Sequence, residues 1–115
     1  MPSLVINQRQ IEGITVLDCA GRISLGEGSV LLRNALQEKM QAPQPKVLLN
    51  LAEVAYIDSS GLGELVSAYV AMHRQDGELK LLHLTRKVHD LLQITKLYTV
   101  FDVFDDEAQA LASFR

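Results

Sequence analysis

Hydrophobic and polar positions along the first part of the chain alternate in short runs, which is the pattern of β-strands. Residues 4–6 and residues 14–20 are two such runs, and Glu12-Gly13 between them is typical of a hairpin turn. From Ser29 onward the apolar residues recur at helical spacing, and Pro43 and Pro45 cannot continue a helix. The pattern therefore predicts a strand pair followed by a helix.

In the second part of the chain, strands and helices alternate. Residues 46–51 are nearly all apolar, as expected of a central strand that is covered on both faces. The remaining elements expected from the pattern are a turn at Ala52-Glu53, a short segment at residues 54–57, a helix opened by residues 58–61 and stopped at Asp76-Gly77, a strand at residues 78–84, a helix capped by Thr85, a short strand at residues 100–103 and a last helix from Asp105-Asp106.

This order, ββαβαβαβα, predicts an α/β fold in which a mixed sheet of four or five strands packs with four helices. The later βαβ units are expected to be right-handed crossovers. With 115 residues the chain has the size of one domain, spanning residues 1–115, and 48% hydrophobic residues suffice for a core without a disulfide or a metal. We expect no cofactor.

Charge and segment composition exclude several classes of function. A net charge of −3 gives no field that would attract nucleic acid. The best apolar run, residues 62–72, is interrupted by Glu64 and Ser67, so a membrane span is not expected, and the amino terminus lacks the features of a secretory leader. Cys19 is the only cysteine, and it is interpreted as a small buried residue in a reducing compartment. A cytoplasmic protein is expected.

The segment richest in candidate chemistry is residues 57–63, a strand-to-helix junction of small polar residues and two glycines. Asp58, Ser59 and Ser60 each carry an oxygen that can cap the helix, and one cap is enough. Glycine in the first helical turns costs up to about 1 kcal/mol relative to alanine. Three capping candidates followed by Gly61 and Gly63 therefore favour a surface that another molecule approaches closely, over capping alone.

An enzymatic interpretation of these serines has weak support. The residues two before Ser59 and Ser60 are not glycine, so the Gly-x-Ser-x-Gly turn of a hydrolase is missing. His83 is the histidine expected nearest a ligand-binding sheet edge, and His73 and His89 are expected to be structural. We do not expect an enzyme, although a small hydrolase using Ser59 or Ser60 with His83 is a remote alternative.

The motifs together resemble the STAS domain shared by sulfate transporters and bacterial anti-sigma factor antagonists. The residues that carry the resemblance are Val-Leu-Leu-Asn-Leu at 47–51, Tyr-Ile-Asp-Ser-Ser-Gly-Leu-Gly at 56–63, Gly-Glu-Leu-Lys-Leu-Leu at 77–82, the helix pattern at 88–97 and Val-Phe-Asp-Val-Phe at 100–104. The chain looks like the free-standing soluble antagonist rather than a transporter tail.

The resemblance implies that Ser59 is the position phosphorylated by a cognate serine kinase. In the family the unphosphorylated antagonist binds this kinase, which is also the anti-sigma factor; phosphorylation breaks the complex, and a phosphatase of the PP2C type restores it. The residues expected at the partner surface are Asp58, Ser60, Gly61, Leu62, Gly63 and Ser24. Ser24 stands where many members have an aspartate. A second interpretation is an unphosphorylated scaffold or sensor that binds a nucleotide or small anion at the helix amino terminus after Asp58.

Overall fold

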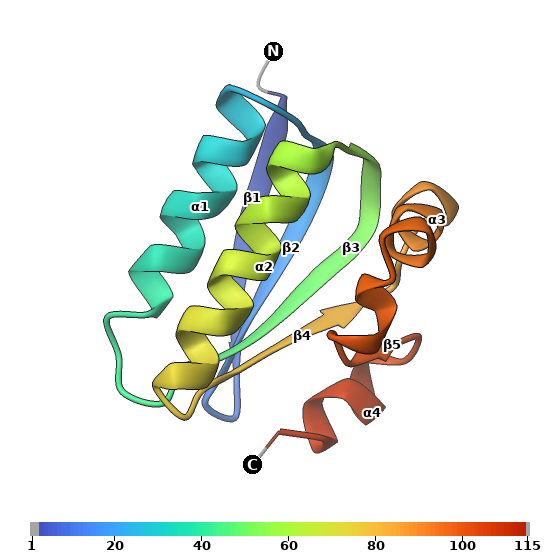
Figure 1. Cartoon of the computed structure of the whole chain (residues 1–115). Helices are drawn as coiled ribbons and strands as arrows, with labels where there is room; N and C mark the ends of the chain where they lie inside the picture. Colours follow the sequence, from blue (N-terminus) through green and yellow to red (C-terminus); the bar gives the residue numbers. More distant parts are fainter. Residues whose placement is uncertain (1–2, 115) are drawn as a thin grey trace.

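A five-stranded sheet forms the centre of the protein in a computed structural model that describes residues 3–114 (Figure 1). The strands lie in the order β1-β2-β3-β4-β5; β1 is antiparallel to β2, and all other neighbours are parallel. The elements are β1 (Leu4–Ile11), β2 (Ile14–Ile23), α1 (Glu27–Lys39), β3 (Lys46–Ile57), α2 (Ser59–Arg74), β4 (Glu78–Leu82), α3 (Arg86–Thr95), a 3₁₀ turn (Leu97–Thr99), β5 (Val103–Phe104) and α4 (Glu107–Ala112). The predicted fold class and element order are confirmed.

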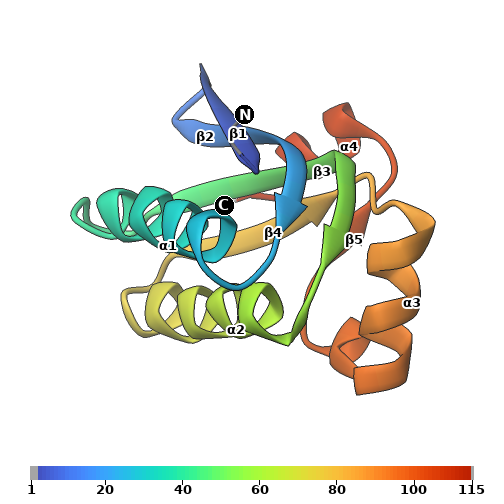
Figure 2. The same ribbon diagram turned by 90° about the horizontal axis from the view of Figure 1, so that it is seen from above.

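The two faces of the sheet are covered unequally. Helices α1 and α2 lie side by side on one face, and α4 lies on the other (Figure 2). Alternation along β3 divides its apolar side chains between them: Val47, Leu49 and Leu51 join the large core under the helices, whereas Leu48 joins a smaller cluster with Ala110 of α4. The central strand is therefore buried on both faces, as its composition predicts.

The turn expected at Ala52-Glu53 is wrong, because β3 continues through it as one strand of 12 residues. Asp18 pairs with Asn50 but Ala20 pairs with Glu53, so β3 carries one extra residue there, which is a β-bulge. The side chain of Asn50 accepts a hydrogen bond from the Ala52 amide at 3.1 Å. Polar and small residues that resemble a turn in the sequence are thus accommodated within the strand.

Other expected boundaries differ from the structure as well: β2 extends to Ile23, and β4 ends at Leu82. Strand β1 extends past the apolar run at residues 4–6 to Ile11, because its backbone pairs with β2 without interruption. Helix α1 begins at Glu27 rather than Ser29. The last strand is confined to Val103–Phe104, since Phe101 turns into the core. The capping roles expected of Thr85 and of the acidic pair before α4 are confirmed, with Asp106 as the residue that caps.

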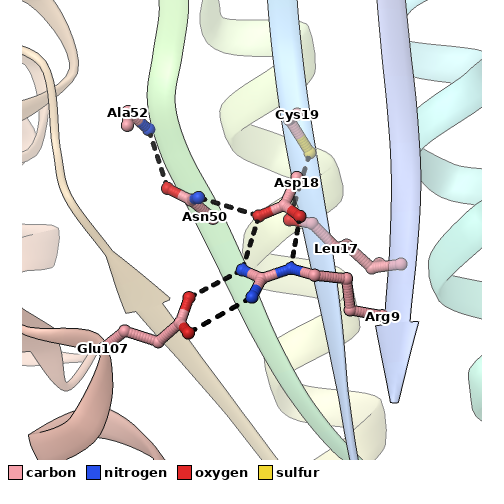
Figure 3. Close-up of polar contacts among 7 residues, drawn as sticks. All are labelled: Arg9, Leu17, Asp18, Cys19, Asn50, Ala52 and Glu107. Atoms are coloured by element: carbon pink, nitrogen blue, oxygen red, sulfur yellow. Dashed lines mark hydrogen bonds and ion pairs between the residues drawn. The ribbon is translucent and has the colours of Figure 1, made fainter. Parts of the chain in front are cut away.

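Helix α4 is fastened to the sheet by an ion-pair network that the sequence pattern did not indicate (Figure 3). The guanidinium of Arg9 donates to both carboxylate oxygens of Asp18, at 2.6 and 3.0 Å, and to both of Glu107, at 2.6 and 3.2 Å. Asn50 donates to Asp18 at 2.8 Å. Side chains from β1, β2, β3 and α4 are thereby joined on one face.

The network shifts the titration of its members. Hydrogen bonds from Arg9 hold the pKa of Asp18 and the pKa of Glu107 below their ordinary values of 3.8 and 4.5. A carboxylate whose pKa is lowered by folding stabilises the protein fully above its unfolded pKa, and this contribution is lost as the pH falls through the folded pKa.

We expect Arg9→Met to lower the free energy of unfolding by about 2 kcal/mol at about pH 7, since hydrogen bonds between charged groups are lost. The difference from wild type should shrink as the pH falls through the lowered pKa values of Asp18 and Glu107, because protonation removes their ion pairs with Arg9. Urea unfolding over this pH range measures it. Arg22→Met is the control, because it also replaces an arginine by methionine but lies outside this network. The Arg22 guanidinium lies over the Tyr56 ring, 4.5 Å from its centroid. A deficit of Arg9→Met that is constant with pH would contradict the assignment.

Candidate functional site

The carboxylate of Asp58 organises the junction between β3 and α2. Asp58 is the N-cap residue of α2, with extended backbone, and its Oδ1 accepts a hydrogen bond from the Gly61 amide at 3.0 Å. Its Oδ2 accepts from the Leu25 amide at 2.9 Å. One side chain therefore caps the helix and fixes the loop between β2 and α1.

This loop, residues 24–26, lies directly beside the amino terminus of α2. The Asp58 amide donates to the carbonyl oxygen of Ile23 at 3.2 Å, so a backbone hydrogen bond also joins the end of β2 to the start of α2. The carbonyl oxygen of Ser24 accepts from the Ser29 amide at 3.0 Å and so holds the loop onto α1. The structure thus brings Ser24 and the residues 58–60, which are far apart in sequence, into one surface.

Asp58 carries a full negative charge in this position. Hydrogen bonds from the amides of Gly61 and then Leu25 lower its pKa below the ordinary value of 3.8. The next residue, Ser59, is exposed, and Ser60 is half-buried. An accessible hydroxyl therefore stands at the helix amino terminus immediately after an ionised carboxylate.

The two glycines of the junction have different roles. Gly61 is buried, and a Cβ there would lie 2.4 Å from the carbonyl oxygen of Ile23, so close packing of α2 on β2 requires glycine. A Cβ on the exposed Gly63 would meet nothing within 4 Å. Leu62 is also buried, at 6% exposure. The expectation that Gly61 and Leu62 contact a partner does not fit their burial, whereas Gly63 is accessible.

Leu25 is a surface residue that the sequence interpretation missed. Its side chain is 81% exposed, in the loop that Asp58 holds. The signal in the sequence is an apolar residue between Ser24 and Gly26, outside any periodic run. An exposed leucine on a loop fixed by hydrogen bonds is a suitable apolar anchor for a protein partner.

The pairing of Ser59 or Ser60 with His83 is wrong. Leu82 pairs with Asn50, so β4 ends beside the middle of β3, and β3 continues for seven further residues to Ile57. At about 3.3 Å per residue this separates His83 from the serines by roughly 20 Å along the sheet, far beyond hydrogen-bond reach. The remote hydrolase alternative therefore lacks the histidine that it requires.

The cysteine and the two remaining histidines within residues 3–114 have structural surroundings. Burial raises the pKa of the Cys19 thiol to about 12, as expected of a small core residue. His73 stacks on Tyr69 with ring centroids 6.0 Å apart, and His89 is exposed beside Asp90. Among the described residues no group of three or more His, Cys, Asp or Glu is arranged to hold a metal ion. No helix in this part of the chain has the length and apolar character that crossing a bilayer requires.

Comparison with known proteins finds similarity along nearly the whole chain. A model of the STAS domain matches residues 5–110. The chain is 26% identical, over 110 residues, to an anti-sigma F factor antagonist of Paenibacillus polymyxa, covering 95% of this chain and 93% of that protein.

Two solved structures with less than a quarter of their residues identical share the fold. An anti-sigma factor antagonist from Mycobacterium paratuberculosis has a TM-score of 0.87 at 19% identity, covering 99% of this chain and 96% of that one. The Bacillus cell fate determinant SpoIIAA in its phosphorylated form has a TM-score of 0.73 at 15% identity, covering 94% and 97%.

The matched variants Gly61→Ala and Gly63→Ala test the packing at the junction. Gly61→Ala should lower the free energy of unfolding by about 1–3 kcal/mol, because its Cβ overlaps backbone that cannot move freely. Gly63→Ala should raise it by about 0.5–1 kcal/mol, because alanine favours the helix and meets open space. Urea unfolding followed by circular dichroism measures both. Equal effects of the two substitutions would contradict the different roles.

Proposed function

This chain belongs to the STAS domain family, and from that premise we propose that it is an anti-sigma factor antagonist switched by phosphorylation of Ser59. Unphosphorylated, it binds an anti-sigma factor that is also a serine kinase, and so frees a sigma factor. Phosphorylation at Ser59 releases it, and a phosphatase of the PP2C type reverses the modification. Its own part in the cycle is binding and not catalysis, in a cytoplasmic pathway.

The observation that carries the proposal is the exposed hydroxyl of Ser59 next to the ionised Asp58 at a rigid helix terminus. A kinase needs an accessible hydroxyl, and a switch needs that hydroxyl at the surface the partner covers. The relative in Paenibacillus polymyxa is named an anti-sigma F factor antagonist, and SpoIIAA exists in a phosphorylated form, which agrees with this use of the fold.

The partner surface is composed of the accessible residues around Ser59. Ser24 and Leu25 contribute from the loop after β2, and Asp58, Ser60 and Gly63 contribute from the start of α2. Leu25 supplies the apolar centre, while the polar residues form its rim, an arrangement common in protein interfaces. The hydrogen bonds of Asp58 to both segments keep this surface assembled in the free protein, which lowers the ordering cost of binding.

Phosphorylation opposes binding through charge and bulk. A phosphate brings about −1.5 to −2 charges next to the carboxylate of Asp58. Within the free protein the amino terminus of α2 offsets this by about 0.3–1 kcal/mol, so the fold is expected to persist. At an interface the same group must be desolvated and repels acidic neighbours, and a loss of about 3 kcal/mol weakens binding more than a hundredfold.

A sensor that binds a nucleotide or small anion at the same helix terminus is the second interpretation. The capping geometry argues against it, because the Asp58 carboxylate already accepts from the Gly61 amide at 3.0 Å. A bound anion would compete with that carboxylate and be repelled by its charge. We therefore prefer the phosphorylation switch.

Ser59→Asp should weaken binding to the cognate anti-sigma factor kinase by about a hundredfold or more, because the added carboxylate imitates the repulsion of the phosphate. The melting temperature should stay within a few degrees of wild type, since exposed substitutions change stability by under about 0.5 kcal/mol. Isothermal titration calorimetry against each anti-sigma factor kinase of the source organism measures the affinity.

Ser67→Asp is the matched control, since Ser67 is an exposed serine on the same helix, two turns beyond Ser59. It should bind as wild type does. Equal binding by Ser59→Asp and Ser67→Asp would contradict the switch, as would intact-mass measurements that find no phosphate on Ser59 in resting or stressed cells. Leu25→Ala should also weaken binding in the same titration, while its melting temperature stays within a few degrees of wild type.

A further inference from the structure

An arginine stacked on an aromatic ring lies beside the candidate site. Arg22 and Tyr56 pair across β2 and β3, and the Arg22 guanidinium lies over the Tyr56 ring, 4.5 Å from its centroid. Tyr56 precedes Ser59 by three residues, and Arg22 precedes Leu25 by three. The pair therefore adjoins both segments of the surface proposed for the partner, at the edge of the sheet where β2 and β3 end (Figure 1).

This pair is accessible on the face of the sheet opposite α1 and α2. The next pair in the ladder, Ile23 and Ile57, is buried in the core under those helices. Because successive side chains of a strand point to opposite faces, Arg22 and Tyr56 project from the other face. The cluster that α4 covers on that face draws on the first residues of β2 and β3 and does not reach this end. Accordingly, Arg22 is exposed and Tyr56 is half-buried.

A second β-bulge in β3 brings the ring under the guanidinium. Gly21 pairs with Val54 and Arg22 pairs with Tyr56, so Ala55 is an extra residue on the β3 side. In a ladder without this bulge, Ala55 would lie opposite Arg22. Bulges commonly re-aim side chains next to functional sites. The irregularity thus gives Arg22 an aromatic partner just before the strand reaches the site.

The backbone at Arg22 is held from two sides. Its amide donates to the carbonyl oxygen of Ser3 at 2.7 Å. Gly28 of α1 packs so closely against the Arg22 carbonyl oxygen that a Cβ would overlap it. Stacking on the Tyr56 ring restrains the side chain as well. The guanidinium is therefore positioned before any partner arrives, which lowers the ordering cost of binding.

The charge of Arg22 is not compensated within the described part of the chain. Arg9, Arg33 and Arg86 each have a carboxylate oxygen at 4.0 Å or less from a guanidinium nitrogen, whereas no such ion pair within residues 3–114 includes Arg22. Stacking on a ring leaves the N–H groups at the edge of the guanidinium free to donate. This planar fork can bind a carboxylate through two parallel hydrogen bonds.

We propose that Arg22 binds a carboxylate side chain of the anti-sigma factor kinase and contributes to the choice among such kinases. The inference rests on the proposed function, because it takes that kinase as the partner. Asp58 supplies a negative charge to the partner surface, and Arg22 adds a positive charge at its margin. A kinase with a basic side chain opposite Arg22 would be repelled, so the two charges together discriminate between partners.

A carboxylate of a protein partner is favoured over a free anion as the group bound. A single exposed guanidinium in water gains little from an ion pair, because the high dielectric constant weakens the attraction. At an interface the contact through Leu25 excludes water, and the same ion pair becomes stronger. The position of Arg22 beside an exposed apolar residue therefore suits recognition of a protein surface.

Isothermal titration calorimetry with the kinase that binds the wild-type protein tests this contact. Arg22→Met should weaken binding by about tenfold or more, because a charge-assisted contact is lost. Arg22→Glu should bind about tenfold more weakly again, because like charges then face each other. Both variants should melt within a few degrees of wild type, since exposed substitutions change stability little. Arg74→Met is the matched control, because Arg74 is exposed at the far end of α2, and it should bind as wild type does.

Salt supplies a second readout, which a merely structural role of Arg22 would not move. Between about 0.05 and 0.5 M salt, the affinity of wild type should fall more steeply than that of Arg22→Met, because screening weakens the ion pair.

The outcomes separate this inference from the proposed switch. Equal affinities of wild type and Arg22→Met, equal affinities of Arg22→Met and Arg22→Glu, or equal salt dependence of wild type and Arg22→Met would overturn the inference, even where Ser59→Asp abolishes binding. An arginine that served only the phosphorylated form would give the first of these results. A wild-type protein that binds none of the organism's anti-sigma factor kinases would overturn the proposed function and, with it, the partner assigned to Arg22.

Discussion

The length of β3 is the constraint on which the arrangement of this protein depends. Its residues 47–50 pair with β2 on one side and with β4 on the other, and its apolar side chains enter the cores on both faces. Beyond Asn50 it pairs only with β2 and continues to Ile57. One strand thus lies at the centre of the core and also extends past it to the candidate site. The site therefore follows directly on a strand and not on a long loop.

The bulge within β3 makes this extension compatible with a well-bonded sheet. One added residue near Ala52 shifts the register, and the Asn50 side chain accepts from the Ala52 amide that the shift leaves out of the regular ladder. Asn50 also donates to Asp18, which Arg9 holds. The residue that supports the bulge therefore belongs to the network that fastens α4.

The half-buried carboxylates of this protein are of two kinds, which differ in the groups that compensate their charge. Asp18 and Glu107 are compensated by a single guanidinium, which ties segments 98 residues apart in sequence. Asp58 is compensated only by backbone amides, so its charge is neutralised less and remains available beside Ser59. The first arrangement stabilises the fold, and the second leaves a negative charge beside Ser59, on which the proposed effect of a phosphate depends.

The amino-acid sequence by itself determined the fold class and the order of the elements, and it indicated the position of the candidate site. These follow from local periodicity, capping residues and prolines, all of which act within a few neighbouring residues: Thr85 caps α3, Asp58 caps α2, and Pro43 and Pro45 lie beyond the end of α1. The motif at residues 58–63 was recognised in the same way, because its small polar residues are contiguous.

Only the tertiary structure decided which of those residues face outward and what lies beside them. Gly61 and Leu62 are buried because α2 packs against the end of β2, and Leu25 joins the site because its amide bonds to a side chain 33 residues away. The bulge at Ala52 and the pairing of Arg9 with Glu107 likewise depend on strand register and helix docking. Such features arise from contacts between distant segments, whose geometry no local pattern of residues encodes.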